Sequence, residues 1–83
     1  MDYLLSEHAT TTVREREIRS EWIDATFGDP EFVLPHESDP ALIYAFRRIP
    51  EHGNRVLRVI YNKDKSPVVI VTVCFDRAMK GKL

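Results

Sequence analysis

The sequence predicts a single α+β domain in which two N-terminal helices pack on a four-stranded antiparallel sheet. Its 83 residues are too few for a second domain. Helical patterns are confined to the first third of the chain, and strand patterns follow from residue 31 onward. Short links between the later strands require antiparallel pairing, and the chain contains no strand–helix–strand unit. We therefore take residues 1–83 as one domain.

The clearer of the two predicted helices covers residues 20–27. Ser20 is a favourable N-cap, and Gly28 can supply a left-handed residue after the last turn. A second helix is predicted over residues 6–17, where Ala9 and Val13 fall on one helical face. Its threonine run lowers the helix propensity, because β-branched side chains lose rotamer freedom in a helix.

The strand pattern predicts four strands, over residues 31–34, 42–49, 55–61 and 68–77. The links at residues 50–54 and 62–66 have the length and composition of hairpin turns. The last strand is apolar on both faces, so we expect it inside the sheet, with helices over one face.

The charge is divided between the two halves of the chain, although the net charge is only −1. Residues 1–41 carry three basic and ten acidic side chains, a net charge of −7, and residues 42–83 carry nine and three, a net charge of +6. This asymmetry fits either a surface that binds a polyanion or an acidic part that complements a basic part within one fold.

Other features indicate a cytoplasmic protein without a cofactor. The single cysteine, Cys74, lies in an apolar run and is expected to be a small buried side chain in a reducing compartment. The chain has no signal-peptide pattern and no apolar run of about twenty residues that would span a membrane. No phosphate-binding glycine loop or metal-ligand spacing is present, and His36 and His52 are expected to be solvated in turns.

Arg58 interrupts an otherwise apolar strand. A buried guanidinium is unfavourable unless it is paired. Arg58 is therefore predicted either to lie in an open groove, where it can hold phosphate, or to pair with an acidic residue of the helices.

Several short motifs, taken in order, resemble the domain-of-unknown-function 4258 family. They are Ser6-Glu7-His8-Ala9, Arg16-Glu17-Ile18, Trp22-Ile23, Asp29-Pro30, and the strand sequences at residues 55–61 and 69–73. Two positions depart from the family pattern: Thr12 stands where a basic residue is common, and Glu17 where glycine is frequent.

The family is grouped with RelE- and BrnT-like toxins, which are small ribonuclease-type domains paired with antitoxins. The resemblance implies a RelE-like fold with a basic groove across the sheet. It also implies a metal-independent endoribonuclease of a toxin–antitoxin pair, with RNA and an antitoxin protein as partners. The alternative is a non-catalytic module that binds protein or nucleic acid, because a fold does not determine an activity.

Metal-free RNA cleavage requires a base, cations around the phosphorus centre and an acid for the leaving oxygen. His8 can serve as acid or base, or can simply bond to the backbone at a helix start. Arg16 and Arg58 can hold phosphate, although Arg16 can equally pair with Glu31 or cap helix carbonyls. Thr72 can offer a hydroxyl or only pack in its strand. These four side chains (His8, Arg16, Arg58 and Thr72) are the catalytic candidates.

Further candidates for RNA binding are Arg47, Arg48, Arg55, Tyr61, Lys80 and Lys82. Arg47 and Arg48 project to opposite faces of their strand, so at most one of them can join Arg58. Tyr61 can instead pack in its strand. The basic tail, residues 77–83, can bind phosphates without sequence selectivity or can be a solubilising terminus.

Overall fold

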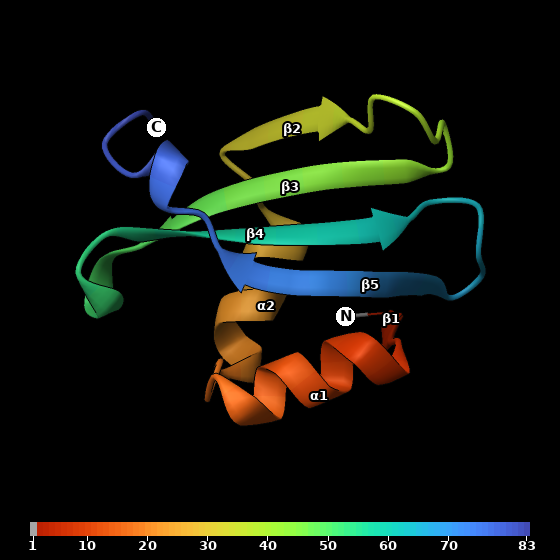
Figure 1. Cartoon of the computed structure of the whole chain (residues 1–83), viewed down its shortest axis with the longest axis horizontal. Coiled ribbons are helices and arrows are strands. Elements are labelled where there is room, and N and C mark those ends of the chain that lie inside the picture. Colours follow the sequence, from red (N-terminus) through yellow and green to blue (C-terminus); the bar gives the residue numbers. More distant parts are fainter. Residues whose placement is uncertain (1) are drawn as a thin grey trace.

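The computed structural model describes residues 2–83 and shows an α+β architecture (Figure 1). The elements in chain order are β1 (Tyr3–Leu5), α1 (Glu7–Glu15), α2 (Ser20–Gly28), β2 (Phe32–Pro35), β3 (Leu42–Ile49), the 3-10 turn η1 (Pro50–His52), β4 (Arg55–Asn62), β5 (Val68–Phe75) and the 3-10 turn η2 (Arg77–Met79). No helix in this part of the chain is long and apolar enough to cross a membrane.

The sheet has five strands in the order β1-β5-β4-β3-β2 and is mixed, so the predicted four-stranded antiparallel sheet is wrong in both respects. The four predicted strands exist and pair antiparallel, but β1 adds a parallel partner at the outer edge of β5. Only three residues, Tyr3–Leu5, form this strand. A segment this short has too few residues to show a two-residue period, and its pairing depends on β5 far along the chain.

Both predicted helices are present, and α1 is capped by a side chain at its N-terminal end. The Ser6 hydroxyl accepts a hydrogen bond from the Ala9 backbone N–H at 3.1 Å, which caps α1. The Ser6 backbone N–H also donates to the Ile70 carbonyl at 2.9 Å, so α1 starts beside the start of β5. Tertiary packing of the buried Ala9 offsets the low propensity of the threonine run. The expectation that Ser20 is the N-cap of α2 is wrong, because Ser20 is the first helical residue and Arg19 occupies the cap position without a side-chain cap hydrogen bond.

The helices cover one face of the sheet and leave the other free of helices. In Figure 1, α2 lies behind β3 and β4, and α1 runs alongside β5. The core between the helices and the sheet comprises Ala9, Ile18, Trp22, Ile23, Ile49, Leu57, Val59, Ile70 and Val73. As predicted, β5 is an internal strand, and its apolar character on both faces follows from that position.

A bulge in β5 sets the direction of its side chains. Tyr61 pairs with Ile70 but Ile60 pairs with Thr72, so Val71 is an extra residue on the β5 side. Ile70 therefore shares the core face with Val73, although a strict two-residue alternation would place them on opposite faces. The bulge brings one more large apolar side chain into the core.

The left-handed residue after a helix lies at Glu17, and the expectation that Gly28 would take this role is wrong. Glu17 has a φ of 54°, whereas Gly28 is the last helical residue of α2 and Asp29 is its C-cap. The Ile18 backbone N–H donates to the Val13 carbonyl at 3.0 Å, as in a Schellman-type helix end. Glycine adopts this backbone conformation without a steric cost, which explains why glycine suits this position.

Replacing Glu17 with glycine is expected to raise the free energy of unfolding by about 0.5–1 kcal/mol, because the left-handed conformation no longer strains a Cβ atom. Urea unfolding followed by circular dichroism measures the change. Glu17→Ala removes the same charge but keeps the Cβ atom, and it is expected to give no gain. Equal stabilisation by both variants would show that the charge, not the backbone conformation, is the cause.

Candidate functional site

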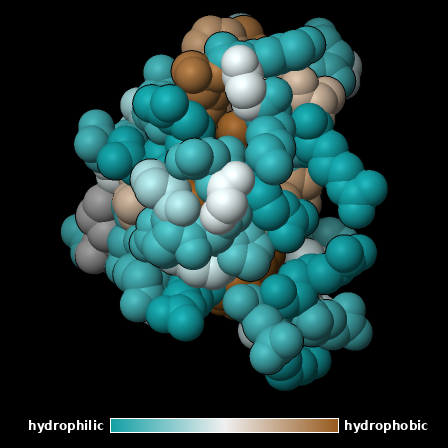
Figure 2. Space-filling model, turned by 90° about the vertical axis from the view of Figure 1, so that its left-hand side faces the viewer, coloured by the Kyte–Doolittle hydropathy of each residue, from teal (hydrophilic) through white to brown (hydrophobic). Residues whose placement is uncertain are grey.

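The ends of four elements meet around a pocket with a volume of about 390 Å³. The C-terminal end of α1 contributes Arg16, the η1 turn His52, the first residue of β4 Arg55, and the η2 turn Arg77. The remaining lining residues are Thr12, Ile18, Cys74 and Phe75. None of these residues is acidic, so the pocket concentrates positive charge without an internal carboxylate. Figure 2 views this end of the molecule, where the surface is largely hydrophilic with small hydrophobic areas between the polar side chains.

His52 is held between aromatic rings at the edge of this pocket. Its ring centroid lies 4.9 Å from that of Trp22 and 4.9 Å from that of Phe75. The Arg55 guanidinium lies 4.3 Å from the centroid of the Phe75 ring and 3.1 Å from the Nε2 atom of His52. Because a guanidinium only donates hydrogen bonds, Nε2 is the acceptor and this geometry suits the neutral imidazole with its proton on Nδ1. The expectation that His52 is simply solvated in its turn is wrong.

A second pocket of about 430 Å³ adjoins the first. The two share Arg55, Phe75 and Arg77, and the second adds Val56, Asp76 and Lys80. We call the two pockets together the basic groove. It brings together three of the predicted site residues, which are Arg16, Arg55 and Lys80. Apart from Asp76, the charged side chains of this lining are basic, and guanidinium and ammonium groups can make charge-assisted hydrogen bonds with phosphate oxygens.

Arg58 has an acidic partner, as one of the two predictions for it required, although that partner comes from the segment after β5 and not from a helix. Its Nη1 atom lies 3.3 Å from Oδ2 of Asp76, and its Nη2 atom lies 3.1 Å from Sγ of Cys74. The Nε atom of Arg58 is buried without a hydrogen-bond partner. Asp76 also accepts a hydrogen bond from the Ala78 backbone N–H at 2.9 Å, which caps η2. Arg58 thus stabilises the turn that carries Arg77 of the basic groove.

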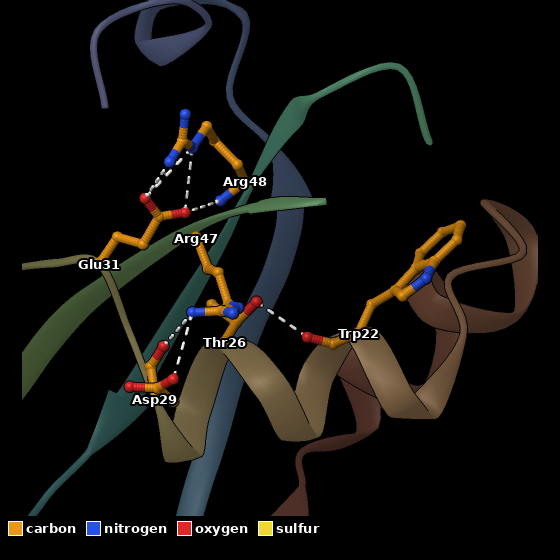
Figure 3. A network of polar contacts seen from close by, with 6 residues as sticks. All are labelled: Trp22, Thr26, Asp29, Glu31, Arg47 and Arg48. Carbon is orange, nitrogen blue, oxygen red and sulfur yellow. Dashed lines mark hydrogen bonds and ion pairs between the residues drawn. The ribbon is translucent and has the colours of Figure 1, made fainter. Parts of the chain in front are cut away.

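Arg47 and Arg48 project to opposite faces of β3, as predicted, and each is bound to an acidic residue (Figure 3). Arg47 donates to the Asp29 backbone carbonyl at 2.8 Å and lies 3.4 Å from its carboxylate. Arg48 pairs with Glu31 at 3.0 Å, on the face of the sheet that lacks helices. Hydrogen bonds from the Arg48 side chain and backbone N–H lower the pKa of Glu31. Both arginines therefore stabilise the fold around β2, and neither lines the basic groove.

His8 does not lie near Arg58, so the expectation that these two side chains form one site is wrong. His8 is exposed on the first turn of α1, beside the start of β5. Arg58 pairs with Cys74 near the end of β5 and projects from the face opposite the helices. Thr72 shares the face of Arg58 but lies outside the groove. His8, Arg58 and Thr72 therefore do not meet at one site.

The other predicted RNA-binding residues lie in two places. Tyr61 packs in the core, with its ring 5.0 Å from that of Phe27 in an edge-to-face arrangement. Lys82 is exposed in the C-terminal tail beyond η2. Within residues 2–83, no group of three or more His, Cys, Asp or Glu side chains is arranged to hold a metal ion.

The sequence interpretation passed over His52 as a member of a site, and it included Arg77 only as part of the basic tail. A signal for Arg77 was present. Antiparallel pairing of the last two strands brings Arg55, at the start of one strand, close to the residues that follow the end of the other. In the structure Leu57 pairs with Phe75, and continuing this register places Arg77 across from Arg55. No local pattern marks His52, since its position depends on the rings of Trp22 and Phe75.

The contribution of Glu31 to stability is expected to depend on pH. Its folded-state pKa lies below the ordinary value of 4.5, so its stabilising effect is present above that value and is lost as the pH falls through the folded-state pKa. Glu31→Gln is expected to destabilise the protein by less than about 1 kcal/mol at pH 7, since the pair is partly exposed. Urea unfolding at pH 7 and pH 3 is expected to show a smaller difference from wild type at pH 3. The same difference from wild type at both pH values would contradict the role of the Glu31 carboxylate. Glu15→Gln, at an exposed position of α1, is the control.

Removing the Asp76 side chain is expected to loosen η2. Asp76→Ala should lower the free energy of unfolding by about 1–3 kcal/mol, because it leaves the half-buried Arg58 guanidinium without its ion pair. It should also accelerate hydrogen exchange at the Ala78 amide, which NMR measures residue by residue. Asp64→Ala removes an exposed ion pair with Lys63 and should leave both quantities nearly unchanged. Unchanged exchange at Ala78 in Asp76→Ala would show that the ion pair does not hold the turn.

The resemblance noted in the sequence is confirmed by comparison with known families. The family described as "Domain of unknown function (DUF4258)" matches residues 5–75, which include the helices and all strands except most of β1. No curated protein and no solved structure matches the chain. The groove residues Arg16, His52, Arg55 and Phe75 lie within the matched segment, and Arg77 and Lys80 lie beyond it. The chain belongs to the DUF4258 family of domains of unknown function.

Proposed function

We propose that this protein is a toxin-like, metal-independent endoribonuclease of a toxin–antitoxin pair, and that the basic groove is its RNA site. The observation that carries the proposal is the position of His52 among Arg16, Arg55 and Arg77 in a pocket without a carboxylate. A histidine surrounded by fixed cations suits a reaction at a phosphodiester, in which negative charge develops on the phosphate oxygens. The likeness to RelE- and BrnT-like toxins, including a RelE-like arrangement of helices and sheet, belongs to the same proposal.

The reaction needs only the RNA itself as nucleophile. His52 accepts the proton of a ribose 2′-hydroxyl at Nε2, and the 2′-oxygen attacks the adjacent phosphorus. The bond from phosphorus to the 5′-oxygen breaks, and this oxygen takes a proton from water. The hydroxide that remains takes the proton held by His52, which restores water and the neutral imidazole. The products are a 2′,3′-cyclic phosphate and a 5′-hydroxyl, and the cyclic phosphate keeps the single negative charge of the diester.

The Arg55–His52 hydrogen bond gives this step a defined starting state. In the free protein the Arg55 guanidinium donates a hydrogen bond to Nε2 of His52 at 3.1 Å. A bound phosphate offers the guanidinium a charged acceptor, which is a stronger partner than a neutral imidazole. Movement of Arg55 toward the phosphate then frees Nε2 to accept the 2′-hydroxyl proton. Arg16 and Arg77 supply the remaining positive charge.

The antitoxin is proposed to cover the same groove with an acidic segment, since its carboxylates would pair with the arginines that otherwise hold phosphate. Action on cellular RNA places the protein in the cytoplasm. A second candidate function is a non-catalytic nucleic-acid-binding module. It is favoured by the lining of the groove, which among the described residues includes one histidine, His52, and no second histidine to act as its acid–base partner.

Incubation of purified protein with a single-stranded RNA oligonucleotide in EDTA tests the proposal. Wild type is expected to produce fragments ending in 2′,3′-cyclic phosphate, detected by mass spectrometry. His52→Phe keeps a ring between Trp22 and Phe75 but removes Nε2, and it should slow cleavage by about a hundredfold or more while retaining RNA binding. His36→Phe makes the same change outside the groove and should leave the rate unchanged.

Three outcomes separate the candidates. RNA that is bound but never cut by wild type would replace the ribonuclease with the binding module. Equal cleavage by wild type and His52→Phe would contradict the assigned role of His52. Neither binding nor cleavage at low salt would end both proposals.

A further inference from the structure

We infer that the basic groove binds two consecutive phosphates of a single-stranded RNA, one in each pocket, with Arg55 and Arg77 between them. This inference rests on the proposed function, because it specifies how the same groove takes its substrate. The starting observation is that each pocket has a cation of its own: Arg16 lines only the first and Lys80 only the second. Arg55 and Arg77 line both.

The two pockets form a continuous path because three residues belong to each. Arg55 and Arg77, at the start of β4 and just after β5, stand at the boundary, and Phe75 contributes an aromatic surface to both pockets. A phosphate on one side of this boundary shares the guanidinium groups with a phosphate on the other side. Each guanidinium carries five N–H donors, enough to bond two phosphates at once.

The path bends around the end of the sheet, which favours a flexible strand over a duplex. The first pocket is lined by Thr12 and Arg16 of α1. The second includes Val56. Val56 lies two residues before Arg58 on β4 and therefore projects from the same face, which lacks helices. A ligand in both pockets therefore passes from the helix side of the sheet to its opposite face. An unpaired strand can follow this turn, and its exposed base can stack on aromatic or guanidinium groups such as Phe75 and Arg55.

The charges along the path fit two phosphates. Asp76 is the one carboxylate among the residues that line the groove, and it is already bonded to Arg58 and to the Ala78 N–H. The remaining charged side chains of the groove are all positive: Arg16, Arg55, Arg77 and Lys80. Two positive side chains are thus available for each phosphate, and His52 is beside the phosphate of the first pocket.

The test uses a 2′-O-methyl uridine trinucleotide, which contains two phosphodiesters and cannot be cleaved by 2′-hydroxyl attack. Its binding is followed by NMR titration of the whole protein at several salt concentrations. Arg16→Gln and Lys80→Gln should each weaken binding about fivefold to tenfold at low salt and reduce the slope of log affinity against log salt by about 0.7, the value per phosphate for single strands. Lys65→Gln, an exposed residue in the turn between β4 and β5, is the matched control and should leave binding unchanged.

Neutral methylphosphonate linkages locate the two phosphates. With one linkage neutralised, the effect of Arg16→Gln should disappear while that of Lys80→Gln persists, and with the other linkage neutralised the reverse should hold. Each variant and each linkage then form a thermodynamic cycle that assigns one phosphate to one pocket. Persistence of both effects with either linkage neutralised would overturn the assignment.

The remaining outcomes distinguish this inference from the proposed function. If Arg16→Gln weakens binding and Lys80→Gln does not, only one pocket binds phosphate, so the two-phosphate inference is wrong while the RNA site stands. If a duplex of 2′-O-methyl RNA binds as tightly as a single strand of the same length, the flexible-strand inference is wrong. If Arg16→Gln, Lys80→Gln and Arg55→Gln all bind the trinucleotide like wild type, the groove is not the RNA site and the proposed function fails with it.

Discussion

The register between β4 and β5 is the constraint on which the rest of the molecule depends. Near the turn, Asn62 pairs with Val69, and beyond the bulge Leu57 pairs with Phe75, one residue further along β5. Without this extra residue, Arg58 would lie opposite Val73 and not opposite Cys74. Val73 would then leave the core, and the guanidinium of Arg58 would face an apolar neighbour. The bulge thus preserves the core and the ion pair of Arg58 with Asp76 together.

The same register also positions the residues of the basic groove. Antiparallel pairing carries the end of β5 back to the start of β4, so that Arg77 follows β5 where Arg55 opens β4. Ser6 fixes the start of α1 at the other end of β5, and the helix then runs alongside that strand. Its last turn therefore delivers Arg16 to the same corner. Three cations distant in sequence meet because one strand aligns them.

The division of charge between the halves of the chain has two structural meanings. Part of it is internal complementarity, since Asp29 and Glu31 of the acidic half hold Arg47 and Arg48 of the basic half. The other part is the basic groove, where no ion pair within residues 2–83 joins Arg16, Arg55, Arg77 or Lys80 to an acidic residue. The interpretation as internal complementarity is therefore confirmed for these residues, and the interpretation as a polyanion-binding surface stays a prediction for the basic groove. Predicting an ion pair requires knowing which side chains are adjacent in space, and charge counts along the chain do not give this information.

Local patterns along the chain were sufficient to predict the class of the fold, because periodicity and hairpin-length turns do not depend on distant residues. These signals located both helices and four strands, with Leu42–Ile49 correct at both ends. They also showed that Arg58 requires either an open groove or an acidic partner. Only the tertiary structure decided the three-residue β1, the bulge in β5, the left-handed Glu17 and the position of His52 between two rings. Each of these depends on contacts between residues far apart in the chain, where packing free energy outweighs local preference.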